Sequence, residues 1–166
     1  MALQKDLDKV YLNIAKEIST LSKCVRAKVG SIIVKDGNIL GMGYNGMPTG
    51  VDNCCEDKVY IHSVFDVILP KLEDYPFTDE LGRYKLVSKV DILHSESNAI
   101  LKAAKMGISI NNSTIYCTLS PCRECSKLIL QSGIKKVVFS EVFKRNNGAI
   151  EFLKQFIEVE QYAENI

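Results

Sequence analysis

Hydrophobic residues recur every three or four positions through the first part of the chain, which is the pattern of an amphipathic helix. This spacing continues over residues 3–22 and predicts one helix there, with a single apolar face turned towards the protein interior. The expected face consists of Leu3, Leu7, Val10, Tyr11, Ile14, Ile18 and Leu21.

A different pattern follows, in which short apolar runs are separated by turn-forming residues. Runs at 29–34 and 39–45 flank the Asp36-Gly37 dipeptide, which is typical of a tight hairpin turn. We therefore expect two antiparallel strands joined by that turn. Residues 46–58 are rich in glycine, aspartate and asparagine, and predict a loop.

Residues 59–90 do not continue this pattern. The apolar run at 59–69 predicts a helix that stops at Pro70. The charged stretch at 71–85 predicts an exposed segment. We therefore expect residues 59–90 to form an insertion.

The second half of the chain alternates between helical and strand-like patterns. Such an alternation favours parallel strands covered by helices, and so an α/β fold class. The simplest organisation is a single domain over residues 1–166, with the insertion at about 59–90. The expected elements are helices at 94–106, at 121–132 and from Ala149 onward, and strands at 113–118 and 135–140.

The composition indicates a globular protein without a broad nucleic-acid or membrane surface. Charged residues make up 25% of the chain, yet the formal net charge is only +1. Proteins that bind polynucleotides usually carry a strongly basic surface, so we expect no nucleic-acid polymer as a partner. We find neither a signal peptide nor an apolar run of membrane-spanning length, and expect no membrane partner. Six cysteines then predict metal or thiol chemistry in the reducing cytoplasm.

Two short motifs at the starts of expected helices carry the candidate chemistry. The first is His94-Ser95-Glu96, and the second is Pro121-Cys122 followed by Cys125. One imidazole and two thiolates are ligands that zinc favours, and three protein ligands leave a fourth position open for water, as in catalytic sites. Two cysteines in the first turn of a helix lie near one point, where the helix dipole favours their thiolate forms. We therefore expect His94, Cys122 and Cys125 to bind Zn2+.

Glu96 lies two residues after His94 and is expected to transfer protons rather than bind the metal. One carboxylate can take a proton from water and return it to a ring nitrogen and then to a leaving amine, which is general acid–base catalysis. His-x-Glu followed by Pro-Cys-x-x-Cys is a motif of zinc deaminases that act on cytosine or adenine rings. Cys-x-x-Cys alone would equally fit a structural zinc half-site or a redox pair, but both motifs together favour a hydrolytic deaminase.

On these residues, the chain resembles the deoxycytidylate (dCMP) deaminases of the cytidine-deaminase-like superfamily. The resemblance runs from about Cys24 to Phe139 outside the insertion. The segment GYNGMPTG at 43–50 narrows it from the superfamily to this family. Two features differ: this chain has Ser95 where the family usually has alanine, and the insertion at 59–90 does not resemble the segments of family members.

The resemblance implies a three-layer α/β/α fold around a mixed central sheet, whose first two strands are the hairpin. It implies the hydrolysis of dCMP to dUMP and ammonia. It also implies a homohexamer that dCTP activates and dTTP inhibits, with Mg2+ accompanying the nucleotide effector.

Four residues near the motifs are expected to bind the substrate. Asn45 follows the second strand, where the superfamily uses an asparagine to contact the nucleoside, although Asn-Gly is also a turn-forming dipeptide. The backbone N–H of Ser95 is expected to donate to the pyrimidine carbonyl. The backbone groups of Thr118 and Ser120 are expected to contact the base amine, although Ser120 would equally cap the following helix.

The phosphate group and an effector need further contacts. Tyr44 and Gly46 are candidates for such a site, although packing and loop geometry explain them equally well. Lys105 is the first candidate for phosphate, because relatives often carry a basic residue at its position near the subunit contact. The candidate cations are Arg26, Lys28, Lys102, Lys105, Lys144 and Arg145.

Four metal-binding residues remain unexplained: Cys24, Cys54, Cys55 and His62. A hairpin returns the chain to its starting edge, so the three thiols could meet there and His62 could complete a closed structural zinc site. Some family members carry a second zinc on cysteines that correspond to Cys24 and Cys54, but their remaining ligands lack counterparts here. The alternative is that Cys24 belongs to the core, Cys54 and Cys55 lie in a loop, and His62 lies on a helix surface.

Three other functions are compatible with the motifs. A deaminase of dCTP, instead of or besides dCMP, would use the same site, because the same cations can bind either phosphate chain. An RNA base deaminase would share the zinc site, but the near-neutral charge disfavours it. A non-catalytic zinc-binding protein would not need Glu96 and would usually fill the fourth metal position.

Overall fold

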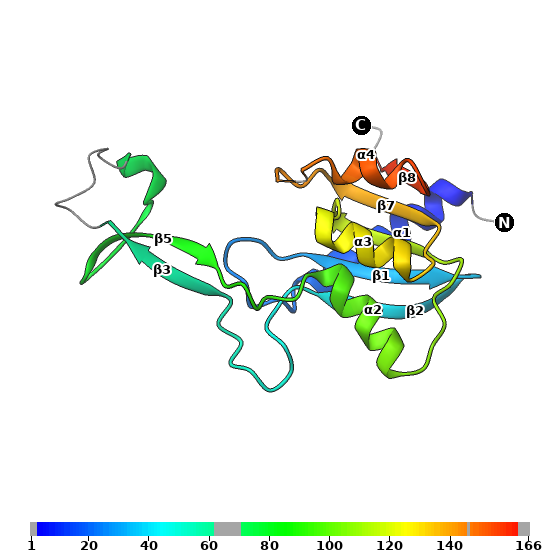
Figure 1. The fold of residues 1–166 in the computed structure, drawn as a ribbon, viewed down its shortest axis with the longest axis horizontal. Helices are drawn as coiled ribbons and strands as arrows, with labels where there is room; N and C mark the ends of the chain where they lie inside the picture. Colours follow the sequence, from blue (N-terminus) through cyan, green and yellow to red (C-terminus); the bar gives the residue numbers. More distant parts are fainter. Residues whose placement is uncertain (1–2, 62–70, 146, 163–166) are drawn as a thin grey trace.

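The computed structural model describes residues 3–61, 71–145 and 147–162, which form a layered core and a projecting arm (Figure 1). The core elements are α1 (Gln4–Ser19), β1 (Gly30–Lys35), β2 (Asn38–Tyr44), α2 (Ser95–Lys105), β6 (Thr114–Leu119), α3 (Arg123–Gln131), β7 (Lys136–Glu141), α4 (Ala149–Leu153) and β8 (Glu158–Gln161). The arm elements are β3 (Glu56–Tyr60), the 3-10 helix η1 (Leu72–Asp74), β4 (Phe77–Asp79) and β5 (Gly82–Ser88). Among the described helices, none combines the length and apolar character needed to cross a membrane.

The central sheet is mixed, as the resemblance implied. Its strand order is β2-β1-β6-β7-β8. Strand β1 pairs antiparallel with β2 and β6, whereas β6, β7 and β8 are parallel. Asp36 and Gly37 join β1 to β2 with φ values of 50° and 78°, the positive values that this type of two-residue hairpin turn requires. The predicted hairpin and the predicted parallel pairing are both confirmed.

Helices cover both faces of the sheet, which gives the predicted three-layer α/β/α fold (Figure 1). Successive residues of a strand point to opposite faces, so each strand supplies two separate cores. On one face, Ile32, Tyr116 and Val138 pack with Leu12 and Ala15 of α1. The core on the other face, to which α2, α3 and α4 contribute, consists of Ile33, Ala99, Ala103, Ile110, Ile115, Cys117, Ile129, Ile134, Val137, Phe139, Ile150 and Leu153.

The first helix lies where it was predicted, but only part of its expected apolar face packs on the sheet, namely Tyr11, Ile14 and Ile18. Leu3 and Val10, from the expected apolar face, are 72% and 51% exposed. The buried face instead includes Leu12 and the carboxylate of Asp8. The Tyr116 hydroxyl of β6 donates a hydrogen bond of 2.7 Å to Asp8. This polar contact with a distant strand accompanies the packing of Leu12 and Ala15, and hydrophobic periodicity cannot reveal it.

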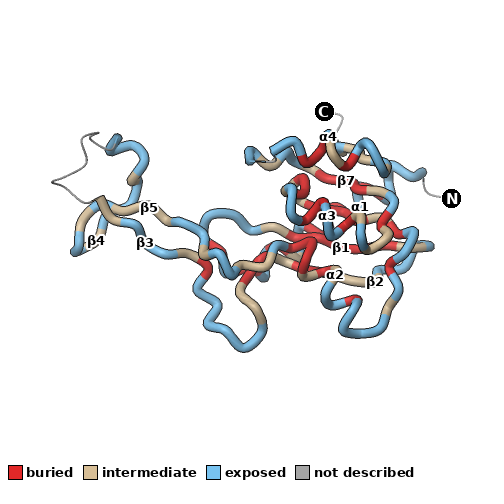
Figure 2. The backbone as a smooth tube through the Cα atoms, viewed as in Figure 1, coloured by how far each residue is buried: buried red, intermediate tan, exposed pale blue. Residues whose placement is uncertain are grey.

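The arm covers the described part of the expected insertion and begins earlier, at Glu56, so the predicted loop over 46–58 is wrong at its end. It is a three-stranded antiparallel sheet in the order β3-β5-β4. Because Tyr60 belongs to β3, the predicted helix over 59–69 is wrong at its start, and residues 62–70 lie outside the described part of the chain. Cross-strand contacts explain the strand: Tyr60 lies opposite Tyr84, whose ring stacks on Phe77 at 5.5 Å between centroids. Figure 2 shows mostly exposed and half-buried residues along the arm, in contrast to the buried core strands.

The end of the chain also departs from the predicted last helix. Helix α4 has only five residues, and the chain then forms β8 beside β7. Lys136 of β7 donates to the carboxylates of Glu158 and Glu160 at 2.7 and 2.9 Å. The predicted helix from Ala149 onward is therefore wrong beyond α4, because pairing with β7 supplies hydrogen bonds and ion pairs that a continued helix would lose.

Candidate active site and metal centre

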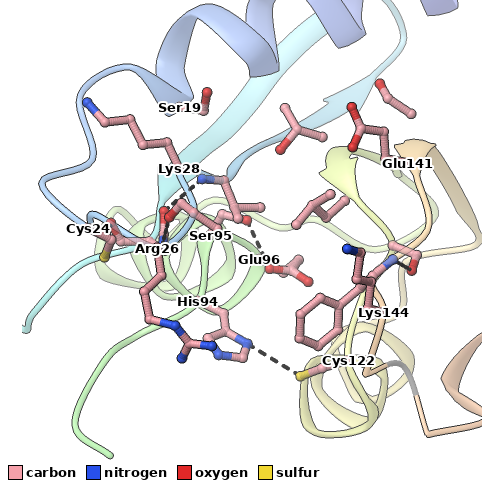
Figure 3. Close-up of a pocket in the computed structure, with 18 of the residues that line it drawn as sticks. Ser19, Cys24, Arg26, Lys28, His94, Ser95, Glu96, Cys122, Glu141 and Lys144 are labelled. Carbon is pink, nitrogen blue, oxygen red and sulfur yellow. Dashed lines mark hydrogen bonds between the residues drawn. The ribbon is translucent and has the colours of Figure 1, made fainter. Parts of the chain in front are cut away.

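Two helices begin beside each other and bring the sequence motifs together. His94 is the N-cap residue of α2 and Cys122 is the N-cap residue of α3. Pro121, expected inside the first turn, lies one residue before the cap. The two cap side chains face each other across the gap between the helices (Figure 3). Gly43 of β2 lets α2 approach the sheet closely, because a Cβ at this position would collide with the Ser95 carbonyl.

His94, Cys122 and Cys125 place their donor atoms within 4.8 Å of one another. The Nδ1 atom of His94 lies 3.3 Å from the sulfur of Cys122 and 3.5 Å from that of Cys125. Zinc bonds to nitrogen and sulfur at tetrahedral angles predict a separation of about 3.6 Å between such donors. The three residues therefore fit a zinc ion in both donor type and spacing.

The electrostatics of these donors also suit a cation. The hydrogen bond from Cys125, followed by that from His94, lowers the pKa of Cys122 to about 3. The same Cys122 contact, together with burial, raises the pKa of Cys125, so the pair shares one proton and Cys122 carries the charge. The hydrogen bond with Cys122 also raises the pKa of His94. A bound dication would displace these protons, because thiolates and neutral imidazole are its ligands.

Glu96 lies in the first turn of α2, beside the donors, and is only 4% exposed. Burial raises the pKa of its carboxyl group, because the charged form loses solvation. The Ser95 hydroxyl donates a hydrogen bond of 2.9 Å to its Oε2 atom. The carboxyl group is therefore held in a fixed position and takes up a proton more readily than an exposed glutamate.

An open cavity of about 1360 Å³ joins the donors to a basic rim. Its walls include His94, Glu96 and Cys122, and Figure 3 shows these side chains around the same space as Arg26 and Lys144. The other predicted site residues in its lining are Lys28, Asn45, Ser95, Thr118, Ser120 and Arg145. The tertiary structure therefore brings together most of the residues expected to bind the base or the phosphate group.

Several of these side chains also hold neighbouring loops in place. Asn45 accepts a hydrogen bond from the Val29 N–H at 2.8 Å and donates one to the Ala27 carbonyl at 2.9 Å. Thr118 accepts from the Gly30 N–H. Ser120 accepts from the Phe143 N–H and does not cap α3. These contacts fix the loops that form the cavity wall, and they occupy both the oxygen and the nitrogen of the Asn45 amide.

Other predicted residues lie outside the cavity lining. Lys105 is at the far end of α2, about 15 Å along the helix from its start. Lys102, on the same helix, lies 5.1 Å above the Tyr44 ring. Gly46 pairs with Leu93 in a short β-bridge that ties the loop after β2 to the start of α2. These contacts position α2, and in this chain they form no part of the space around the metal donors.

Sequence reasoning missed the contribution of the arm. The Glu56 carboxylate, at the start of β3, accepts hydrogen bonds from the backbone N–H groups of Val25 and Arg26 at 3.0 and 3.2 Å. Ser88, at the end of β5, accepts a hydrogen bond of 2.9 Å from the Arg26 guanidinium. The base of the arm therefore holds Arg26 at the cavity, and no sequence motif indicates this arrangement.

The unexplained cysteines come only partly together. Cys24 and Cys55 are each 2% exposed, and burial together with the neighbouring Cys24 thiol raises the pKa of Cys55 to about 12. The Cys54 thiol is exposed and donates to the Glu56 carbonyl. His62 lies outside the described residues, and among those that are described the His94 centre is the only group of three metal donors.

Comparisons with known proteins agree with this site. The family model described as "Cytidine and deoxycytidylate deaminase zinc-binding region" matches residues 5–141. The deoxycytidylate deaminase of Enterobacteria phage T4 is 39% identical over 150 residues, which span 81% of this chain and 78% of that protein. The deoxycytidylate deaminase of Mycobacterium phage D29 is 34% identical over 134 residues, which span 81% and 94%.

A solved structure extends the similarity to the three-dimensional fold. It is the crystal structure of the dCMP deaminase from the cyanophage S-TIM5 in complex with dCMP and dUMP. At 35% sequence identity it superposes with a TM-score of 0.75, covering 96% of this chain and 99% of that chain. With its metal donors in place and relatives that match most of its length, the chain belongs to the deoxycytidylate deaminases, within the cytidine and deoxycytidylate deaminase family of zinc proteins.

Proposed function

We propose that this chain catalyses the hydrolysis of dCMP to dUMP and ammonia. The observation that carries the proposal is a single cavity that joins His94 and Cys122 of the three-donor centre, a buried glutamate and a basic rim. Membership of the deoxycytidylate deaminases supports it, as does the 35% identical cyanophage enzyme solved with dCMP and dUMP. A cytosine ring would lie near the donors, and its 5′-phosphate would point towards the rim.

Zinc, when bound, supplies a Lewis acid that lowers the pKa of a water ligand to about 7. Glu96 has the position of the proton carrier, because its carboxyl group lies beside the three donors. It takes a proton from the attacking water and delivers it to the ring nitrogen. It then transfers the second proton of that water to the amine, which leaves as ammonia when the carbon–nitrogen bond breaks. The water oxygen remains on the ring as the new carbonyl.

Backbone groups at the start of α2 would orient the ring. The first N–H groups of a helix have no partner within the helix. The Ser95 N–H belongs to this first turn and lies in the cavity wall, so it would donate to the pyrimidine carbonyl. Thr118 and Ser120 line the same wall, where their backbone groups would contact the base amine.

Arg26 is our proposed contact for the phosphate group. Its guanidinium presents five N–H donors, and the hydrogen bond to Ser88 uses only one of its nitrogens. The planar fork of these donors matches phosphate oxygens. Lys28, Lys144 and Arg145 line the same cavity and would add positive charge. Lys105 would reach a nucleotide only on a neighbouring subunit.

We expect dCMP to be turned over faster than dCTP, cytidine or a single-stranded oligonucleotide at equal concentrations. The cavity offers cations for a phosphate group, and the chain as a whole has a net charge of only +1. Ammonia release from the four compounds measures this directly. Faster turnover of cytidine or the oligonucleotide would contradict the proposal. Faster turnover of dCTP would show only that the number of phosphate groups on the preferred substrate was wrong.

Variants of two arginines test whether Arg26 contacts the phosphate group. Arg26→Ala should raise the KM for dCMP by about tenfold, the effect of losing a hydrogen bond to a charged group, and leave cytidine turnover unchanged. Arg83→Ala removes an exposed arginine from β5 of the arm, outside the cavity lining, and serves as the matched control. If both variants change the KM for dCMP equally, Arg26 does not contact the phosphate group.

Three alternative functions share the metal site. A dCTP deaminase would use the same cations, and the four-compound assay distinguishes it. An RNA base deaminase has the same fold, since a transfer-RNA adenosine deaminase superposes with a TM-score of 0.56, but at 16% identity this similarity concerns the fold alone. A non-catalytic zinc protein would not need a buried glutamate beside the metal donors, so the presence of Glu96 disfavours this function.

We further propose that the chain assembles into a homohexamer regulated by dCTP and dTTP, with Mg2+ accompanying the effector. The support is family membership, and Tyr44 and Gly46 remain candidates for effector contacts. A ligand shifts a conformational equilibrium only through its different affinities for the two states. The rate should therefore depend sigmoidally on dCMP concentration, becoming hyperbolic with dCTP and more sigmoidal with dTTP. A hyperbolic dependence that neither nucleotide changes would exclude this regulation.

A second, structural zinc at Cys24, Cys54, Cys55 and His62 stays a prediction. Cys24 and Cys55 support it by their contact, whereas Cys54 would have to turn towards them. A cytoplasmic location and a single-domain organisation over 1–166 with an insertion at about 59–90 also stay predictions. All six cysteines are free thiols, which is consistent with a reducing compartment.

A further inference from the structure

Ser95, the residue between the metal ligand His94 and the proton carrier Glu96, is completely buried. Its hydroxyl oxygen lies 2.9 Å from the Oε2 atom of Glu96 and 2.7 Å from the hydroxyl oxygen of Ser31 in β1. Ser31 is also completely buried and lies directly opposite Cys117 of β6, whose thiol is buried as well. A chain of polar side chains therefore runs from the central sheet to the catalytic carboxyl group.

The direction of the hydrogen bonds in this chain follows from the number of protons. A serine hydroxyl has one proton to donate and can accept at its lone pairs. When Ser95 donates to the Glu96 carboxylate, the proton between the two serines must come from Ser31. Ser31 therefore fixes the orientation of the Ser95 hydroxyl, and the Ser95 hydroxyl in turn fixes Oε2 of Glu96.

This arrangement removes a freedom that glutamate otherwise has. The last torsion of a glutamate side chain is broad, so its carboxyl group rotates easily unless a contact holds it. With Oε2 held by Ser95, the other oxygen, Oε1, is the one left to face the cavity. The hydroxyl can also accept a hydrogen bond from a protonated carboxyl group. The contact therefore persists whether Glu96 is protonated or ionised during a reaction cycle.

We infer that Ser95 is a positioning residue that presents Oε1 of Glu96 to the reacting water, and that Ser31 supports it. The inference rests on the proposed role of Glu96 as proton carrier. Ser95 would therefore affect the rate of the chemical step and not the affinity for the nucleotide.

Ser95→Ala tests the inference in the full-length, zinc-loaded protein. We expect kcat for dCMP to fall by about tenfold, the effect of one hydrogen bond to a charged group, while KM stays within about twofold. Ser31→Ala should lower kcat by about threefold, because Ser95 keeps its hydroxyl but loses the partner that orients it. The double variant should be no slower than Ser95→Ala, because Ser31 acts only through Ser95.

Controls separate this inference from a general loss of stability and from failure of the proposed function. Ser113→Ala removes another buried serine hydroxyl, one bonded to the Ile110 carbonyl and outside the cavity lining, and should leave kcat unchanged. Zinc content and thermal unfolding of every variant report on folding. If Ser95→Ala keeps full kcat while Glu96→Gln is inactive, the positioning role is wrong and the proposed function stands. Additive losses in the double variant would also overturn the inference. If Glu96→Gln is active, the proton-carrier role on which the inference rests fails. If the unmodified, zinc-loaded protein releases no ammonia from dCMP, the proposed function itself fails.

Discussion

Replacing Glu96 by glutamine should lower kcat for dCMP by at least about 10²–10⁴-fold, the usual contribution of general acid–base catalysis. An amide of the same shape cannot carry a proton between the attacking water, the ring nitrogen and the amine. The fold and the zinc content should persist, because Glu96 is not among the three donor residues. Steady-state rates, together with the zinc content of the purified variant, measure both expectations.

Glu124→Gln is the matched control for this substitution. Glu124 lies in the first turn of α3, as Glu96 lies in the first turn of α2, but its side chain is 78% exposed and pairs with Lys127. This variant should retain the rate of the unmodified protein. Near-normal turnover of Glu96→Gln with full zinc content would exclude Glu96 as the proton carrier.

Replacing Cys125 by alanine should remove one zinc ion per chain together with the activity. Cys125 is a buried donor, and its loss leaves only His94 and Cys122 for the metal. Loss of residues that merely orient metal ligands already costs about 10–100-fold in affinity, so loss of a ligand should cost more. Elemental analysis of protein purified without chelator, combined with the dCMP assay, measures the result.

The same analysis tests the proposed structural zinc. Two zinc ions per chain are expected if that site exists, and Cys24→Ala should then lose one ion while activity that depends on Glu96 survives. One zinc per chain in the unmodified protein would exclude the second site. Unchanged zinc content in Cys125→Ala would instead contradict the assignment of the catalytic donors.

The amino-acid sequence by itself determined the metal motifs and the order of most core elements. His94 and Glu96 lie two residues apart at a helix start, and Cys122 and Cys125 lie three apart at another. Within each motif, the geometry of a single helix turn sets the relative positions of the two residues. A short stretch of sequence is therefore enough to predict them. The Asp36-Gly37 turn was likewise predictable, because its two residues alone allow the positive φ values that a tight hairpin needs.

Only the tertiary structure decided which of these elements meet and how the cavity is completed. Tyr116 binds the buried Asp8 of α1, and Tyr84 pairs with Tyr60 in a strand where a helix was expected to begin. Lys136 forms ion pairs with Glu158 and Glu160 of β8, where the last helix was expected to continue. In each case the contacting residue is distant in the sequence, so a local hydrophobic pattern cannot predict the contact.

The contacts that shape the active site belong to the same class. Ser88 holds the Arg26 guanidinium across 62 positions of the chain, and Ser31 orients Ser95 across 64. A motif can identify the residues that bind a metal or carry a proton, because their chemistry belongs to the side chains themselves. Their orientation depends on hydrogen bonds between distant segments, and these exist only once the sheet and the arm have formed.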